Sequence, residues 1–199
     1  MKQFISKRNT VTLRDGLVYK QTKSPLAAAE EAELLRALRA HGAAVPEVLD
    51  CRGEVLVLEY LPGEPLPDII ERGDYEPDAL AGALCGWFAG FYEAVQAMPA
   101  GTPGESRGDV NGRNFLVHDG KVYGVDFEGR CIGSKARDAG RLAAFLATYD
   151  TCDTAKRDAL AEAFMRGFAI EFGCKVEKIL LERALEYEAM HLRRGHHGS

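Results

Sequence analysis

Two short stretches decide the fold: RGDVNGRN at residues 107–114 and VDFE at residues 125–128. Apolar residues lie between them on both sides of Asp119-Gly120, a pair that favours a two-residue turn. The pattern predicts a β-hairpin over residues 115–127. Such a hairpin brings the two polar stretches together at its open end.

The register of this hairpin predicts which polar side chains meet. With the turn at Asp119-Gly120, Asn114 pairs with Val125 and Arg113 with Asp126, which places Asn114 and Asp126 side by side. Amide and carboxylate oxygens suit Mg²⁺, which takes its remaining ligands from water and nucleotide phosphates. Asp109, on the preceding loop, is then free to orient a hydroxyl group.

A second hairpin is predicted over residues 10–21, where apolar and polar residues alternate around Asp15-Gly16. With that turn, Val11 pairs with Lys20, so Lys20 lies on the same face as apolar side chains. The register therefore predicts an inward-facing lysine. The alternative is a slipped register that leaves Lys20 in solvent.

A helix is predicted to follow, because Ser24-Pro25 supplies a capping hydroxyl and a first-turn proline, and Gly42 supplies a stop. Glu31 precedes three leucines by three, four and seven residues, so it shares their buried face. A carboxylate there needs a cation. The alternative is that Glu31 lies at the edge of the apolar stripe and extends into solvent.

The remaining chain predicts an α+β fold. A strand-like run over residues 54–61 is broken by Pro62-Gly63-Glu64-Pro65, which we interpret as a linker. Helical periodicity then dominates, over residues 77–95, 137–149, 153–172 and 174–192. The order predicts a small antiparallel β-rich lobe at residues 1–61 and a helical lobe at residues 62–199.

The spacing D-x-x-x-x-N from Asp109 to Asn114, followed by a strand that ends in D-F, resembles the catalytic and metal-binding loops of protein kinases. Among protein-kinase-like enzymes, the chain is most similar to aminoglycoside and choline kinases, with RIO-type kinases as neighbours. The resemblance implies a two-lobed fold, ATP as phosphoryl donor, Asp109 as catalytic base, and Asn114 and Asp126 as Mg²⁺ ligands. Lys20 and Glu31 would then hold the α- and β-phosphates.

Two further segments extend the resemblance. The run VLEYLPG at residues 57–63 resembles a kinase hinge, whose backbone at Glu59 and Leu61 would bond adenine while Leu58 lines the pocket. Asp138, near the start of a predicted helix, resembles the aspartate that holds the catalytic loop in kinases.

Three departures from the family pattern stand out. No G-x-G-x-x-G is present, and only residues 5–9 can turn over the phosphates, with Ser6 and Lys7 or Arg8 as donors. Arg107 stands where the family usually has histidine, which bears on the loop geometry. Glu128 replaces the glycine of protein kinases, an ending closer to the small-molecule kinases.

Bulk composition excludes several classes of protein. A net charge of −5 over 199 residues offers no basic face for nucleic acid. Residues 1–14 hold no apolar run typical of a signal peptide, and no later run approaches a membrane span. The five cysteines are odd in number and show no C-x-x-C spacing, which suits a reducing compartment. We therefore expect a cytoplasmic protein, and the histidines at 196 and 197 support no metal site.

The function that these features predict is transfer of the γ-phosphoryl group of ATP to a hydroxyl of a small molecule. The alternatives are an atypical Ser/Thr protein kinase with a protein substrate, similar to RIO-type kinases or the small kinase of the tRNA threonylcarbamoylation machinery, and a nucleotide-binding pseudokinase. Arg113 could neutralise substrate or phosphoryl charge, or it could be a solvated loop arginine. The acceptor and the oligomeric state cannot be read from the sequence.

Overall fold

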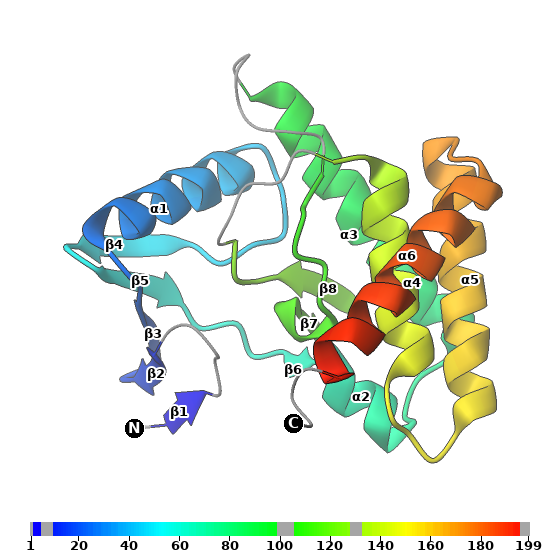
Figure 1. The fold of residues 1–199 in the computed structure, drawn as a ribbon. Coiled ribbons are helices and arrows are strands. Elements are labelled where there is room, and N and C mark those ends of the chain that lie inside the picture. Colours follow the sequence, from blue (N-terminus) through cyan, green and yellow to red (C-terminus); the bar gives the residue numbers. More distant parts are fainter. Residues whose placement is uncertain (1, 5–9, 99–105, 128–132, 196–199) are drawn as a thin grey trace.

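The computed structural model describes residues 2–4, 10–98, 106–127 and 133–195. Its fold is α+β: an antiparallel sheet with one helix comes first, and a mostly helical region follows (Figure 1). This is the two-part arrangement that the sequence predicts.

The first sheet has five antiparallel strands in the order β1-β2-β3-β5-β4. The strands are β1 (Lys2–Phe4), β2 (Thr10–Arg14), β3 (Leu17–Gln21), β4 (Val48–Arg52) and β5 (Val55–Glu59). Asp15 and Gly16 have φ values of 50° and 77°, as a two-residue hairpin turn of this hand requires. Val11 pairs with Lys20, which confirms the predicted register and excludes the slipped one. β1 and β4 were not predicted.

Helix α1 (Pro25–Ala40) lies along this sheet and contacts β4 and β5 (Figure 1). It begins where predicted, because the Ser24 side chain accepts a hydrogen bond from the Ala27 amide at 3.2 Å. Its buried face includes Leu35 and Leu38, and Glu31 lies on that face with them. The prediction that Glu31 is buried is therefore confirmed.

A second sheet has three strands in the order β6-β7-β8. They are β6 (Glu64–Pro65), β7 (Phe115–His118) and β8 (Lys121–Gly124). The β7–β8 turn at Asp119-Gly120 is the predicted one. Glu64 and Pro65 pair with β7, so the interpretation of this segment as a linker was wrong. Proline is tolerated because β6 is an edge strand.

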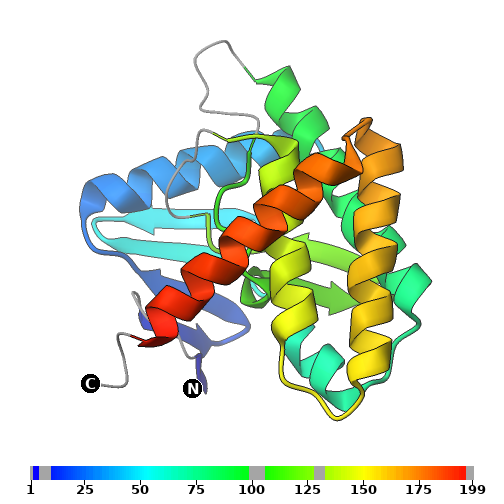
Figure 2. The ribbon, with the colours of Figure 1, turned by 45° about the vertical axis from the view of Figure 1, so that its right-hand side comes forward.

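The helical region packs around an aromatic core. Its helices are α2 (Leu66–Arg72), α3 (Pro77–Ala97), α4 (Lys135–Thr148), α5 (Thr154–Phe172) and α6 (Val176–Gly195). α3 packs on α5, and α4 packs on α5 and α6 (Figure 2). Phe88 of α3 is fully buried, and its ring centroid lies 5.4 Å from that of Phe168 of α5. Burial of such a ring contributes about 1.5–3 kcal/mol.

One carbonyl joins the first sheet and α1 to the helical region. The oxygen of Ala44, in the loop after α1, accepts hydrogen bonds from Trp87 Nε1 at 2.9 Å and from the Gly124 amide at 3.0 Å. A Cβ at Gly124 would lie only 2.2 Å from the Trp87 ring, so glycine lets the indole reach this carbonyl. The end of β8 is therefore fixed against both parts of the molecule.

Candidate active site

A buried ion pair joins the first sheet to α1. Lys20 Nζ on β3 lies 2.8 Å from each carboxylate oxygen of Glu31 on α1. Both side chains are nearly inaccessible, at 6% and 3% exposed. The predictions that both charges are buried and that they are paired are thus confirmed.

A third charge from the other end of the chain completes this cluster. Lys20 Nζ also donates to Asp126 Oδ1 at 2.7 Å, and the Phe127 amide donates to Glu31 Oε1 at 3.1 Å. Asp126 has a φ of 60°, a left-handed conformation that turns the chain out of β8. We call Lys20, Glu31 and Asp126 the charge cluster; the sequence did not predict the bond from Lys20 to Asp126.

The cluster keeps its lysine charged. Burial would lower the pKa of Lys20, but the charges of Glu31 and Asp126 outweigh it, so this pKa is raised above 10.5. Burial raises the pKa of Glu31, and the charge of Lys20 offsets part of that effect. One cation thus holds two carboxylates, and Asp126 is the more accessible of them.

One predicted pairing at the hairpin end is wrong. The Val125 amide bonds the Asn114 carbonyl at 2.9 Å, as the register predicts. Arg113, however, lies in the 3₁₀ turn η1 (Gly112–Asn114), which Asn111 caps, and Asp126 leaves the ladder through its positive φ. The left-handed residue carries the Asp126 side chain to Lys20 instead.

Asp109 lies on a loop whose backbone is held on both sides. Its side chain is exposed, and its Oδ1 accepts a hydrogen bond from the Asn111 amide at 3.3 Å. Its carbonyl accepts from Asn114 Nδ2 at 3.3 Å and from Arg107 Nη1. The carboxylate therefore faces solvent on a backbone fixed by neighbouring side chains.

Asp138 anchors the start of this loop. The residue is completely buried in α4, and its carboxylate accepts from the Arg107 amide at 2.7 Å, Ser106 Oγ at 2.7 Å and the Gly108 amide at 3.2 Å. Tyr92 of α3 donates to it at 2.9 Å. These four donors satisfy a buried carboxylate. The geometry is that of an aspartate holding the loop, as the resemblance implies.

Arg107 bridges the loop to the segment after β8. Its guanidinium is buried and donates to the carbonyls of Asp109, Val125 (2.6 Å) and Asp126 (3.2 Å). It also lies 4.6 Å from the centroid of the Phe127 ring. Burial lowers the pKa of Arg107, and nearby Asp109 and Asp138 oppose this effect. The arginine that departs from the family pattern thus joins two polar segments, a role that the sequence did not reveal.

A second arginine connects the loop to α4 and α6. Arg141 Nη1 of α4 donates to the Gly108 carbonyl at 2.8 Å, and Arg141 Nε lies 3.2 Å from Glu186 of α6. Only the long-range packing of α4 and α6 brings these residues together. For that reason no local signal in the sequence could have identified Arg141.

The 3₁₀ turn after the loop is closely packed. A Cβ at Gly112 would lie 2.1 Å from the Phe145 ring, so no larger residue fits there without displacing that ring. Arg113 is exposed. Burial raises the pKa of Tyr149, at the end of α4, and the charge of Arg113 opposes this effect. Its suggested contact with a substrate stays a prediction.

The predicted hinge follows the end of β5. Leu58 and Leu61 are buried, and the Glu59 amide donates to the Glu47 carbonyl at 2.9 Å. The Glu59 carboxylate accepts from Arg39 at 2.8 Å, so the side chain is already engaged. Among the described residues, the Leu61 amide has no hydrogen-bond partner. A backbone donor therefore remains for a ligand.

The oxygen atoms of Asn114 and Asp126, at the open end of the β7–β8 hairpin, are of the kind that Mg²⁺ prefers as ligands. Asn114 Nδ2 donates to the Asp109 carbonyl, which leaves its amide oxygen as an acceptor. Asp126 supplies a carboxylate that is 40% exposed. Within the described ranges no three His, Cys, Asp or Glu side chains form a metal-binding group, so water and phosphate oxygens would complete the shell.

Several expectations lie outside the described residues. They concern Ser6, Lys7 and Arg8 over the phosphates, Glu128 after the D-F pair, and the histidines at 196 and 197.

The sequence profile of the phosphotransferase enzyme family matches residues 8–107, just over half of the chain. The chain belongs to this family. The match confirms the prediction of a phosphotransferase with the protein-kinase-like fold. It ends before Asp109, so the catalytic and metal roles of the polar loop are not covered by it.

Solved structures show the same fold for this phosphotransferase. The amicoumacin kinase hAmiN, in complex with AMP-PNP, Ca²⁺ and Ami, superposes with a TM-score of 0.65 at 14% identity, covering 92% of this chain and 77% of the other. The streptomycin–ATP–APH(2")-IIa ternary complex gives 0.63 at 14% identity, covering 92% and 81%. A choline/ethanolamine kinase family protein from Mesorhizobium loti gives 0.54 at 16% identity, covering 100% and 81%. No curated protein matches the chain significantly.

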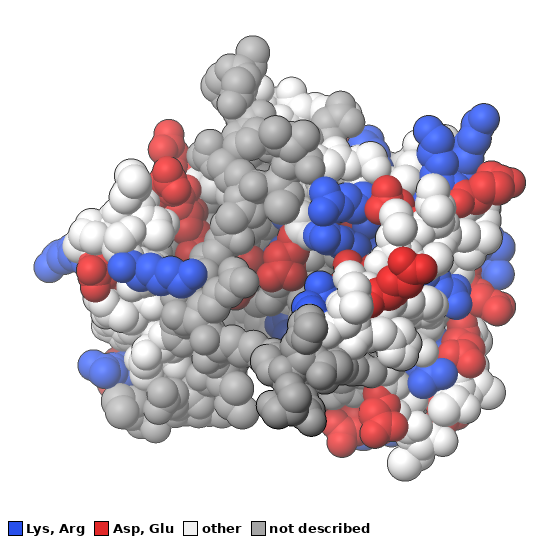
Figure 3. Space-filling view, in the orientation of Figure 1, with Lys and Arg blue, Asp and Glu red and all other residues white. Residues whose placement is uncertain are grey.

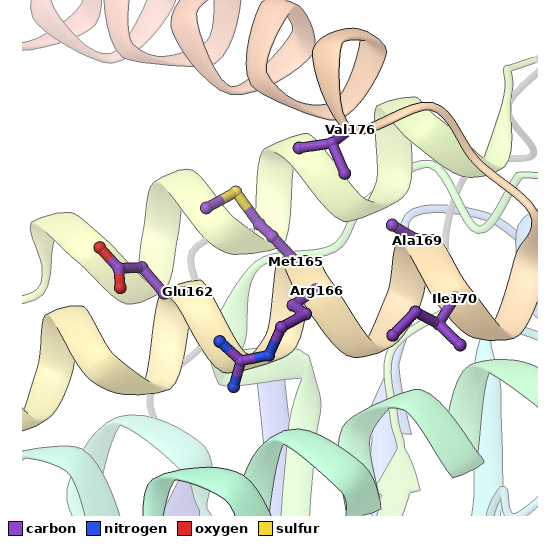
Figure 4. A pocket seen from close by; sticks show the side chains of 6 residues that line it. All are labelled: Glu162, Met165, Arg166, Ala169, Ile170 and Val176. Carbon is purple, nitrogen blue, oxygen red and sulfur yellow. The ribbon is translucent and has the colours of Figure 1, made fainter.

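The rest of the phosphotransferase shows mixed surface charge (Figure 3) and an apolar pocket apart from the candidate site. Among the described residues, no helix is long and apolar enough to cross a membrane. Positive and negative side chains are interspersed on the face in Figure 3. An apolar pocket between α5 and the start of α6 is lined by Met165, Ala169, Ile170 and Val176, among others, and none of the site residues described above lines it (Figure 4).

Proposed function

We propose that this phosphotransferase transfers the γ-phosphoryl group of ATP to a hydroxyl of a small molecule. The observation that carries the proposal is that Arg107 connects two parts of the site. It bonds the backbone of Asp109, whose carboxylate is exposed, and the backbone of the segment that carries Asp126 of the charge cluster. One part offers a fixed cation for phosphate oxygens, and the other offers a carboxylate for a hydroxyl. The similar structures support the same chemistry, because one is an amicoumacin kinase with AMP-PNP and another is a ternary complex of APH(2")-IIa with streptomycin and ATP.

In the proposed ground state, adenine bonds the backbone at Glu59 and Leu61 and packs on Leu58, with the lobe boundary between Leu61 and Pro62. Lys20, held by Glu31, contacts the α- and β-phosphates. Asn114 and Asp126 would hold Mg²⁺, which when bound offsets phosphate charge.

The proposed chemical step begins at Asp109. Its carboxylate orients the acceptor hydroxyl and accepts its proton as the acceptor oxygen bonds the γ-phosphorus. The bond from that phosphorus to the β–γ bridging oxygen breaks, and ADP leaves. Arg107 keeps Asp109 at a fixed position relative to Asp126, because it bonds the backbone of both.

The test is an activity panel. Purified protein with ATP and Mg²⁺ should release ADP with some members of a panel of hydroxyl metabolites, sugars and aminoglycosides. Phosphorylation of proteins alone would favour the atypical protein kinase instead. Nucleotide binding without turnover on any acceptor would favour the pseudokinase.

The metal role has its own test. Asp126→Ala should weaken Mg²⁺-dependent ATP binding at least tenfold by calorimetry, because it removes the anionic ligand. Asp119→Ala, an exposed aspartate in the β7–β8 turn, is the control. Unchanged Mg²⁺-ATP affinity in Asp126→Ala would contradict the role of Asp126 without affecting that of Asp109.

A further inference from the structure

The outer face of α6 carries leucines that no part of the described chain covers. Leu181, Leu185 and Leu192 are 60%, 51% and 67% exposed, whereas Ile179 on the inner side is fully buried. Figure 2 shows α6 crossing α4 with its outer side open. Single exposed leucines are ordinary on a protein surface, but a row of them on one helix marks a contact surface.

These leucines form a stripe with a charge inside it and another at one end. Lys178, Leu181, Leu185, Glu188 and Leu192 follow one another at spacings of three, four, three and four residues. At 3.6 residues per turn they lie within an arc of about 80°. All five are exposed. We call these residues the α6 stripe.

The first four residues of the α6 stripe are self-complementary in order. If a second α6 runs antiparallel, Lys178 faces the partner's Glu188 and Leu181 faces the partner's Leu185. The same register also satisfies the other two positions, because a two-fold contact repeats each pair. We propose that α6 pairs antiparallel with α6 of a second copy of this chain.

Charge favours a second copy as the occupant. Lys178 and Glu188 have no ion-pair partner within the described residues, and ten residues separate them along α6, so they cannot pair with each other. In the two-fold contact each gains a partner of opposite charge. A parallel arrangement would instead place like charges together.

The size of the contact sets its strength. The α6 stripe spans about 21 Å of helix, which is short for a permanent interface. We therefore expect a reversible dimer with a dissociation constant on the order of 1–100 µM. The stripe points about 120° away from Glu186, so pairing leaves the bond between Glu186 and Arg141 in place.

Sedimentation equilibrium over about 1–300 µM protein tests the proposal. Lys178→Glu and Glu188→Lys should each weaken the dimer about tenfold, because two attractions become two repulsions. The double variant Lys178→Glu/Glu188→Lys should return to within about threefold of the wild type. Leu185→Glu should abolish the dimer, and Leu26→Glu, at an exposed leucine on α1, should leave it unchanged.

Three outcomes would overturn this proposal. The first is a wild-type monomer at every concentration. The second is a double variant weaker than both single ones. The third is a monomeric protein in which Leu185→Glu raises the KM for the acceptor, which would assign the α6 stripe to the substrate site. Circular dichroism melting curves check that each variant folds. The first two outcomes are measured by sedimentation alone and do not depend on the proposed reaction.

Discussion

The charge cluster and the Asp109 loop hold their carboxylates in opposite ways. In the cluster, Lys20 and Glu31 are buried and bond through their side chains. In the loop, the Asp109 side chain is exposed, and Arg107, Asp138 and Arg141 hold the backbone around it. Buried charges must be paired, while an exposed carboxylate can stay available if its backbone is fixed.

The difference predicts that the two regions fail differently. A substitution in the cluster changes stability as well as activity, because it leaves a buried charge uncompensated. A substitution of Asp109 changes activity with little effect on stability, because its carboxylate is exposed and accepts a hydrogen bond from an exposed backbone amide.

The largest expected effect is that of Asp109→Asn on turnover. Loss of a group that accepts the hydroxyl proton should reduce kcat about 10²–10⁴-fold, while ATP affinity and the melting temperature stay near those of the wild type. Steady-state kinetics and calorimetry measure this on the acceptor found by the panel. Asp119→Asn is the control. Comparable turnover in Asp109→Asn would disprove the catalytic role.

The second prediction concerns stability. Lys20→Met and Glu31→Gln should each cost about 3–5 kcal/mol in urea unfolding, as for one partner of a buried pair. Lys20→Met should cost more, because it leaves two carboxylates together. The double variant should cost less than the sum of the two. Simple additivity would show that the two residues do not act as a unit.

The third prediction tests the bridge between the two regions. Arg107→Met removes a donor from the carbonyls of Asp109, Val125 and Asp126, of which that of Asp109 keeps the bond from Asn114 Nδ2. Each buried acceptor left without a donor costs about 1–3 kcal/mol, and removal of the buried charge offsets part of this cost. We expect a net loss of about 2 kcal/mol and a kcat reduced about tenfold or more with little change in KM. Arg166→Met, on the exposed side of α5, is the control. An unaltered kcat would show that Arg107 does not position Asp109.

The smallest effect is on pH dependence. The folded-state pKa of Lys20 is raised above 10.5, so its charge contributes full stability below that pH, and the contribution is lost as pH rises through the raised value. A difference of one between the folded and unfolded pKa of a group corresponds to about 1.4 kcal/mol of stability. Unfolding free energies should therefore fall above about pH 10.5 in the wild type and less steeply in Lys20→Arg, whose guanidinium stays charged. Equal slopes would contradict the raised pKa.

Much of the first sheet and the long helices could be predicted because their signals are local. The Asp15-Gly16 pair sets the register that carries Lys20 inward, and the Ser24 cap fixes where α1 begins. The two-residue strand β6 could not be predicted, since its only support is pairing with β7, some fifty residues later.

The sequence predicted residues of the candidate site but not all of the contacts that the structure shows between them. Spacing identified Lys20, Glu31 and Asp109, because each follows from a register or a motif. It paired Asp126 wrongly, because one left-handed residue redirects the chain and nothing in the local sequence signals it. Arg107 was noted only as a departure, since its bonds depend on two segments meeting in space.

The bonds between Glu31 and Phe127 and between Lys20 and Asp126 also affect the order in which the chain folds during its synthesis. Both join residues about a hundred positions apart, so the N-terminal sheet and α1 leave the ribosome without them. At about 5–20 residues per second, roughly 3–14 s pass between emergence of Glu59, the last residue of β5, and emergence of Phe127. During that interval Lys20 lacks its bond to Asp126, and Glu31 lacks its bond from the Phe127 amide. The first third of this protein therefore matures only after translation has passed the second hairpin.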